Sequence, residues 1–189
     1  MHVYKWATLP QKPNVLDFID NDNSKISWSR DLKNDLLRER IAEYNEEKIR
    51  VAQYRPFTRR FLFLDRILNE EVYQYPSYFP TPDSETENIV ICVGGYGRKS
   101  FAVTACNLIA DVNFYGDPQQ SFPFYTYAED GSQRRENITD WALAQFRATY
   151  QSSIENQQSP ITKWHIFHYI YALLHHPTYR DTYAANLRR

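Results

Sequence analysis

The fold is decided by a run of five apolar residues, Ile89-Val90-Ile91-Cys92-Val93, which ends at Gly94-Gly95. A short continuous apolar run bounded by glycines is typical of a strand that is buried on both faces. Shorter runs on its C-terminal side predict further strands at residues 101–104, 109–112 and 121–127. Pro123 lies in the last of these, and because proline cannot donate a ladder hydrogen bond, we expect that strand at a sheet edge.

Upstream of this run, residues 61–64 form another compact apolar strand candidate. Residues 75–82 contain three prolines and predict a loop, because proline disfavours both the sheet ladder and the helix interior.

Helices are expected on both sides of the strands. Ser27 or Ser29 can cap a helix that continues to about Tyr44, with leucines at near-helical spacing. Thr139 predicts the start of a helix through about residue 150, and two more helices are expected at 162–175 and 179–187. The first of these three is expected to bury the apolar side chains Trp141, Leu143, Ala144 and Phe146.

This order of helix, strands and helices predicts an α+β fold, in which a mixed β-sheet follows an N-terminal helix and precedes a C-terminal helical subdomain. We divide the chain into an irregular lead-in, residues 1–24, and a folded domain, residues 25–189. Within the domain, residues 25–130 are the strand-rich part and residues 131–189 the helical part.

Composition limits the class of protein. The 189 residues fit one domain, and 16% aromatic residues with only five glycines predict a buried core. A formal net charge of -1 excludes a globally basic nucleic-acid binder and leaves a locally basic face as the route to DNA. We expect a cytoplasmic protein with no membrane partner, because the sequence shows no signal peptide or spanning segment. Cys92 and Cys106 have no CxxC or His-spaced partners, so we expect buried, unpaired thiols of the kind found in cytosolic proteins.

Charge is unevenly distributed along the chain. Six basic residues and a single acid, Asp65, lie between residues 48 and 66, whereas residues 70–87 hold five acids and no base. Five of the six bases are arginines, which suit phosphates and guanine edges, and aromatic residues are interleaved with them. Two interpretations stay open: a DNA-binding face, or a solvated strand face that is paired with nearby acids. The six bases are Lys48, Arg50, Arg55, Arg59, Arg60 and Arg66.

The glycine-rich segment at residues 94–100 is not a phosphate-binding loop of the nucleotide-binding type. Arg98 stands where such a loop needs glycine, and the residues that follow predict a strand instead of a helix. A turn that brings Arg98 and Lys99 to a DNA phosphate is one interpretation, and a plain hairpin turn is the other.

No catalytic or metal site is expected in this chain. His165 and His168 lie on an apolar helix without the glutamate or cysteine partners of a metal site, so packed or capping histidines are favoured. No serine lies in a nucleophile-elbow motif, and neither the amino-methyltransferase motif nor the metal-dependent nuclease motif is present. We therefore expect no cofactor, and no enzymatic activity in this chain alone.

Many ordered blocks of the sequence resemble the C-terminal target-recognition (specificity) domain of type ISP restriction–modification enzymes. The resemblance extends over about residues 15–189. Among the blocks that carry it are residues 25–33, Lys48-Ile49-Arg50, Tyr54-Arg55-Pro56-Phe57, Leu64-Asp65-Arg66, Val72-Tyr73-Gln74, residues 91–99, Asn137-Ile138-Thr139-Asp140 and residues 175–180. In that family the domain is joined to a nuclease, a helicase-like ATPase and an adenine methyltransferase. None of their motifs is present here, so we expect a fragment or a split remnant of such an enzyme.

The resemblance implies a sequence-recognition module for double-stranded DNA, which would direct the methyltransferase, helicase and nuclease domains of the parent enzyme. The residues expected to contact DNA are Arg55, Arg59, Arg60, Tyr73, Gln74, Arg98 and Lys99. Tyr54 and Phe57 are as consistent with a core position as with DNA contact, because Pro56 fixes a turn that can bury both rings. The alternative function is a docking piece for the methyltransferase domain without DNA contact, for which the acidic residues 70–87 are suited.

Overall fold

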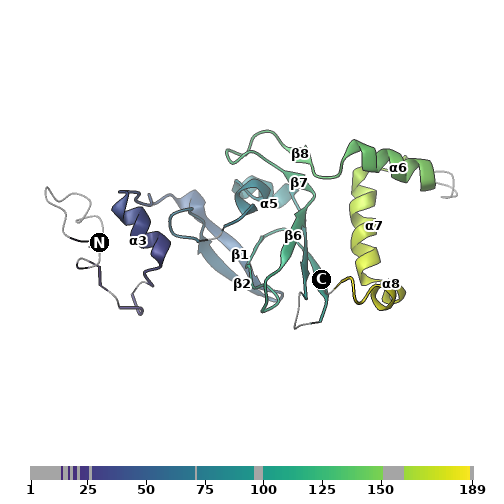
Figure 1. Ribbon diagram of the computed structural model, residues 1–189. Helices are drawn as coiled ribbons and strands as arrows, with labels where there is room; N and C mark the ends of the chain where they lie inside the picture. The colour runs from purple at the N-terminus through teal and green to yellow at the C-terminus, as the bar shows by residue number, and fades with distance from the viewer. Residues whose placement is uncertain are drawn as a thin grey trace. The chain divides into compact units, whose positions relative to one another are not determined.

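The structure of the chain is a computed structural model, and Figure 1 shows the order of its elements. It describes residues 14, 17, 19, 20, 22–25, 27–70, 72–95, 100–150 and 160–187. The chain divides into two compact units, one formed by Met1–Arg50 with Leu62–Val72 and the other by Val51–Phe61 with Tyr73–Arg189. The expected lead-in, residues 1–24, lies largely outside the described residues.

Helix α3 (Arg30–Leu37) belongs to the first unit and begins as expected after a serine cap. The Ser29 hydroxyl accepts a hydrogen bond from the backbone N–H of Leu32 at 3.1 Å. The expectation that the helix continues to Tyr44 is wrong, because Glu39 adopts a left-handed conformation (φ 59°) that an α-helix cannot continue. A short 3-10 helix, η1 (Glu46–Lys48), follows.

The strand predicted from the apolar run is β3 (Val90–Gly94), and it is the centre of a three-stranded sheet in the second unit. Its neighbours are β4 (Ala102–Cys106) and β6 (Gln120–Pro123), and both pair with it antiparallel. The sheet order is β4-β3-β6, so the strand that contains Pro123 lies at an edge, as predicted. Four of the five residues of β3 are buried, as expected for a central strand.

A second sheet has the order β2-β1-β5. It is formed by β1 (Ile49–Arg55), β2 (Thr58–Phe63) and the two-residue strand β5 (Ile109–Ala110), which pairs parallel to β1. The third sheet pairs β7 (Tyr125–Thr126) with β8 (Arg135–Glu136). Parallel and antiparallel pairs together with separate helices confirm the α+β class.

The strand predicted at residues 121–127 is divided into β6 and β7 at Phe124. This residue is fully buried, and its backbone N–H donates to the carbonyl of Ile89 at 2.9 Å. Burial of the ring and this bond take Phe124 out of the strand pairing, which an alternating sequence pattern cannot reveal.

The loop predicted at residues 75–82 is wrong in part, because it contains helix α4 (Tyr75–Tyr78) and the start of helix α5 (Pro82–Glu87). Pro76 and Pro82 lie in the first turn of their helices. The backbone N–H groups of a first turn have no intrahelical acceptor, so proline costs no hydrogen bond there.

The described residues after β8 contain helices α6 (Asp140–Tyr150), α7 (Lys163–His175) and α8 (Pro177–Thr182). The start and end of α7 agree with the prediction. Helix α8 begins earlier than expected, because Pro177 is suited to the first helical turn, and it also ends earlier than expected. The prediction that α6 buries Trp141 and Ala144 is wrong, since both are exposed. Leu143 and Phe146 are half-buried.

The core of the second unit joins α7 to the central sheet. Ile91, Val103, Phe124 and Phe167 are buried together. The ring of Trp164 on α7 stacks on Phe124 with 3.7 Å between the centroids. This packing holds α7 against the sheet. Because one side of α7 is covered in this way, its sequence is rich in apolar residues.

Candidate nucleic-acid interface

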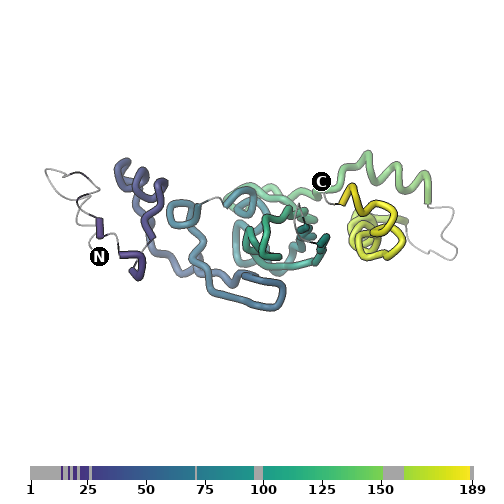
Figure 2. The backbone as a smooth tube through the Cα atoms, turned by 60° about the horizontal axis from the view of Figure 1, so that its bottom comes forward, coloured from purple at the N-terminus to yellow at the C-terminus, as the bar shows by residue number. Residues whose placement is uncertain are grey.

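Strands β1 and β2 form a hairpin that carries three of the seven residues expected to contact DNA. The tube in Figure 2 follows its two strands through the turn at Pro56-Phe57. Neither turn residue has a positive φ, so the turn is of the ordinary kind in which proline is favoured at the second position. The three residues are Arg55, Arg59 and Arg60.

Arg55 is held in place by contacts within the chain. Its guanidinium donates to a carboxylate oxygen of Asp111 at 3.0 Å and to the carbonyl of Tyr54 at 2.6 Å. It also stacks on the Tyr54 ring at 4.0 Å, and 35% of its side chain is exposed. Several of the five N–H groups of the Arg55 guanidinium are therefore already hydrogen-bonded within the chain. Arg55 thus stabilises the hairpin, and its remaining N–H groups are available to a ligand.

Arg59 and Arg60 differ from Arg55, because both are exposed and neither forms an ion pair within the described part of the chain. The Arg60 guanidinium lies 5.9 Å from the centre of the Tyr54 ring. Two adjacent arginines without a carboxylate partner give the hairpin a local positive charge on a chain whose formal net charge is -1.

The structure separates the basic run into paired and free residues. In the first unit, the Lys48 ammonium lies 2.7 Å from a carboxylate oxygen of Asp65. Burial alone would raise the pKa of Asp65, but hydrogen bonds from Lys48 and from the backbone N–H groups of Ile67 and Leu68 outweigh it and hold the pKa below its usual range. Pairing with acids therefore accounts for Lys48 and Arg55, and not for Arg59 and Arg60.

Tyr73 and Gln74 lie at the start of α4 in the second unit. Both are exposed, and Tyr73 has the left-handed backbone conformation (φ 47°) that suits a turn before a helix. The Gln74 side-chain carbonyl accepts a hydrogen bond from the Tyr78 hydroxyl at 2.8 Å, which leaves its amide N–H groups for a ligand. Arg98 and Lys99, the other two expected contacts, lie outside the described residues.

A series of polar contacts links the hairpin to the segment that contains Gln74. Asp111, the partner of Arg55, accepts a hydrogen bond at its backbone carbonyl from the Gln119 side-chain amide at 3.0 Å. The same amide lies 3.5 Å from the hydroxyl of Tyr75, the first residue of α4. Residues far apart in the sequence are thus held in one connected arrangement, which sequence analysis did not identify.

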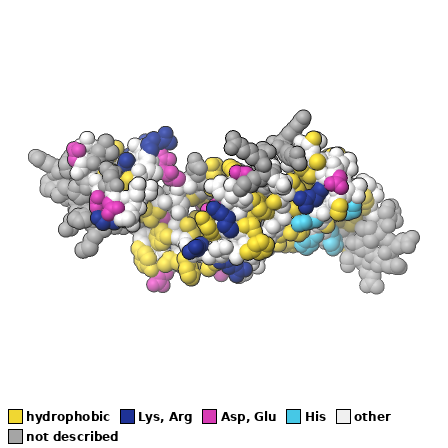
Figure 3. All heavy atoms as spheres, turned by 90° about the horizontal axis from the view of Figure 1, so that it is seen from below, with side chains coloured by type: hydrophobic (Ala, Val, Ile, Leu, Met, Phe, Trp, Pro, Cys, Tyr) yellow, Lys and Arg dark blue, Asp and Glu magenta, His cyan; other side chains and the backbone are white. Residues whose placement is uncertain are grey.

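The hairpin also exposes large apolar rings. Phe57 at the turn is 100% exposed and Phe61 on β2 is 84% exposed, while Tyr54 is 40% exposed. The interpretation that the turn buries Phe57 is therefore wrong. On the face of the molecule shown in Figure 3, basic side chains lie beside exposed hydrophobic ones. The signal in the sequence was the interleaving of aromatic residues, Phe61 among them, with the arginines of the basic run.

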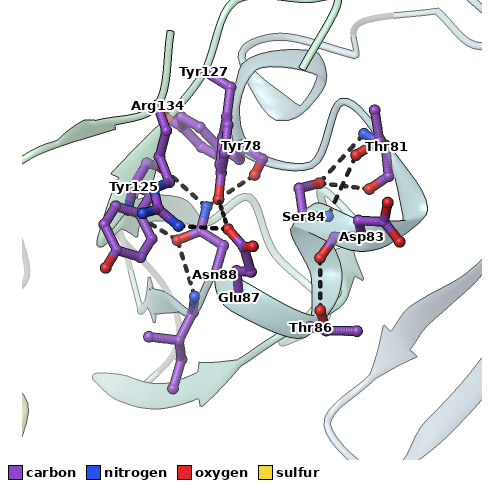
Figure 4. A network of polar contacts seen from close by, with 11 residues as sticks. Tyr78, Thr81, Asp83, Ser84, Thr86, Glu87, Asn88, Tyr125, Tyr127 and Arg134 are labelled. Carbon is purple, nitrogen blue, oxygen red and sulfur yellow. Dashed lines mark hydrogen bonds and ion pairs between the residues drawn. The ribbon is translucent and has the colours of Figure 1, made fainter. Parts of the chain in front are cut away.

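The residues just before β3 form a polar network with α4 and with the segment around β7, shown in Figure 4. Asn88 is 2% exposed, and its side-chain amide donates to the carbonyls of Tyr78 and Tyr125 at 2.8 and 2.9 Å. Arg134 forms an ion pair with Glu87 at 2.7 Å and lies over the Tyr125 ring. This network fixes helices α4 and α5 against β7.

The titration of several groups in and beside the central sheet is shifted by burial and hydrogen bonding. A hydrogen bond with Cys106, together with burial, raises the pKa of the Cys92 thiol, whereas the same hydrogen bond lowers the pKa of the Cys106 thiol. Burial raises the pKa of Tyr75 and raises that of Tyr115 to about 12. Both cysteines are free, and Cys92 is buried as expected while Cys106 is half-buried. These groups serve the sheet as hydrogen-bonding partners.

The histidines of α7 have structural contacts. His165 closes the N-terminus of the helix, because its Nδ1 accepts from the backbone N–H of Thr162 at 3.1 Å, and His168 stacks on Trp164. The capping interpretation is confirmed for His165. Within the described ranges, no group of three or more His, Cys, Asp or Glu side chains could hold a metal ion, and no helix is long and apolar enough to cross a membrane.

Three solved structures that share this fold are complexes with DNA or with a DNA substrate mimic. The chain is similar to DrdV in a DrdV–DNA complex (30% identity, TM-score 0.73), of which it covers 18% while all of this chain is aligned. It is equally similar to a nuclease-deletion mutant of the type ISP enzyme LlaGI in complex with a DNA substrate mimic, at 30% identity and a TM-score of 0.73. The alignment covers 100% of this chain and 13% of the LlaGI chain. The ATP-dependent type ISP enzyme LlaBIII, bound to DNA, shares the fold at 24% identity and TM-score 0.69, over 86% of this chain and 10% of that one.

The chain spans between 10% and 18% of the length of the chains in these three structures. The family profile of the type ISP C-terminal specificity domain matches residues 6–189, and the chain belongs to this family. The resemblance seen in the sequence is therefore confirmed. No curated protein matches the sequence significantly.

Proposed function

We propose that this chain recognises a short sequence of duplex DNA and so directs adenine methylation and cleavage by the other domains of a type ISP enzyme. The observation that carries the proposal is the β1–β2 hairpin, on which Arg59 and Arg60 are exposed without an ion pair in the described chain. The DrdV–DNA complex and the complex of the type ISP enzyme LlaGI with a DNA substrate mimic, both matched over the full length of this chain, support it. Because DNA is the ligand, the cytoplasm is the compartment that we assign.

The hairpin suits the major groove of DNA, which is wide enough for a two-stranded β-ribbon. In this proposal Arg59 and Arg60 reach phosphates or guanine edges, and Arg55 is oriented by Asp111 behind them. Tyr73 and Gln74 are polar readers from the adjacent segment, while Arg98 and Lys99 contact phosphates. The chain contributes recognition only, and residues 25–130 and 131–189 act as the strand-rich and helical parts of one recognition domain.

Substitution of the two free arginines tests the proposal. Each arginine that neutralises a phosphate contributes about -0.9 to the slope of log affinity against log salt, so Arg59→Ala or Arg60→Ala should make that slope shallower by about 0.9. An arginine that reads a base should instead lose about 1–3 kcal/mol of discrimination at one position of the site. The measurement is a titration of labelled duplexes at several salt concentrations.

Arg38→Ala is the matched control, because Arg38 is an exposed arginine outside the hairpin. It should leave affinity and salt slope close to those of the original chain. The proposal fails if the double variant Arg59→Ala/Arg60→Ala binds DNA with unchanged affinity and slope. Failure of the original chain to bind duplex DNA at low salt would favour a docking role for the acidic segment instead.

A further inference from the structure

We propose that Phe57 reads a base, with its ring packed against the 5-methyl group of a thymine in the major groove of the target DNA. This inference rests on the proposed function and assigns a specific contact within it. It is carried by the position, the exposure and the charged surroundings of this ring.

The exposure of Phe57 has no explanation within the fold. The ring is 100% exposed, and the turn depends on the fixed φ of Pro56 and not on an aromatic residue after it. No ring contact or cation–π contact involves Phe57 in the described chain. Phe57 shares the hairpin with two further exposed rings, Tyr54 and Phe61, and exposed apolar side chains grouped in this way mark a surface that is covered in a complex.

The charges around Phe57 identify the partner as a polyanion. Arg59 and Arg60 follow it within three residues, and neither is neutralised by a carboxylate in the described part of the chain. An apolar groove on a protein would have to desolvate both guanidiniums without compensation, whereas DNA places phosphates on both sides of each groove. The combination of one apolar tip and two free arginines therefore favours DNA over a protein surface.

The geometry of the hairpin selects the type of contact. The major groove admits a two-stranded ribbon, and in this proposal the hairpin enters it so that the exposed ring at the turn approaches the base edges. The thymine methyl is the apolar group that base edges present in that groove, and phenylalanine is one of the side chains that pack against it. Arg59 and Arg60 then lie further along the ribbon, where they can reach phosphates or guanines next to the thymine.

Removal of the methyl group alone provides the sharpest test. The probe is the duplex that the chain selects from a randomised pool, with each thymine of the motif replaced in turn by deoxyuridine. One replacement should weaken binding by about three- to fivefold, the effect of removing one buried methyl group. Phe57→Ala should weaken binding to the thymine duplex about tenfold and should abolish the difference between thymine and deoxyuridine at that position.

A second readout localises the contact. A duplex with 5-iodouracil at the sensitive position should cross-link to Phe57 on irradiation, and mass spectrometry of the digested adduct identifies the residue. The control variant is Trp141→Ala, which removes another exposed ring (73% exposed) that lies on α6 instead of the hairpin. It should leave binding unchanged, and because Phe57 is fully exposed, Phe57→Ala should melt at the same temperature as the original chain.

Several outcomes would overturn the inference. One is a selected motif without an A·T pair, and another is a Phe57→Ala variant that keeps the original affinity and the original deoxyuridine penalty. Equal weakening on thymine and deoxyuridine duplexes, with increased 2-aminopurine fluorescence beside the site, would indicate a ring wedged between base steps instead. If Phe57→Ala lost binding to the methyltransferase part and not to DNA, the partner would be protein. A chain that binds no duplex at all would refute the proposed function itself, which is a different result from binding that ignores Phe57.

Discussion

The side chain of Asn88 uses all of its hydrogen-bonding positions inside the protein. Its amide donates to the carbonyls of Tyr78 and Tyr125, and its oxygen accepts from the backbone N–H groups of Ile89 and Tyr125 at 2.9 Å each. A buried polar side chain stabilises a fold when it is fully satisfied in this way and destabilises it when a partner is lost. Asn88 therefore fixes how α4 and β7 meet the start of the central strand.

We expect Asn88→Ala to reduce the free energy of unfolding by about 2–4 kcal/mol, because it leaves buried backbone groups without partners. Urea unfolding followed by circular dichroism measures this loss. Asn113→Ala is the control, since Asn113 is exposed and its side chain forms no hydrogen bond within the described residues; it should change stability by less than about 0.5 kcal/mol. Equal effects of the two substitutions would contradict the role given to the network.

The importance of Asn88 could not be predicted from the sequence. Asparagine before a strand is typical of a turn, and nothing in the local pattern indicates that its amide is buried. Its acceptors lie 10 and 37 residues away, so only the folded structure brings them to it. The same holds for Arg55 and Asp111, which are 56 residues apart, although the arginine itself was identified from charge alone.

Among the elements, helices α6 and α7 show that a sequence pattern can predict a helix without predicting what the helix packs against. The first was predicted from the capping threonine Thr139 and its apolar side chains, the second from the apolar residues of 162–175, and both are present. Trp164 of α7 stacks on Phe124, whereas Trp141 of α6 is 73% exposed. Apolar spacing predicts a helix and a preferred face, but it does not tell whether another element covers that face.

We expect Trp164→Ala to destabilise the protein by about 2–4 kcal/mol, because it removes the ring that joins α7 to the central sheet. Trp141→Ala should cost less than about 0.5 kcal/mol, since that ring is in contact with water. Thermal or urea unfolding of the two variants decides between them. A larger loss for Trp141→Ala would mean that α6 packs differently from the structure described.

The predictions of secondary structure were less accurate at prolines than within the apolar run. The strand-forming pattern at residues 89–93 is close to β3, because a fully apolar run has few alternatives to burial. The three prolines at residues 75–82 suggested a loop, yet the first turn of a helix accepts proline and two short helices form there. Local composition alone cannot tell a proline that opens a helix from one that excludes it.

At the scale of the whole molecule, the chain is a type ISP specificity domain that carries a positively charged hairpin on a nearly neutral protein. Family membership was predictable because many ordered blocks of sequence agree. The candidate interface was predictable in part: the hairpin arginines were identified, but their division into one paired and two free residues depends on tertiary contacts. The exposure of Phe57 could not be decided either, because Pro56 fixes a turn without fixing what packs against it.

Selection from a randomised duplex pool, at low and at near-physiological salt, decides whether this chain alone reads DNA sequence. We expect one short motif to be enriched and its enrichment to survive the higher salt, because salt weakens phosphate contacts much more than it weakens hydrogen bonds to base edges. Binding that enriches no motif and disappears as salt rises would contradict this expectation, and would mean that the hairpin holds phosphates without reading bases.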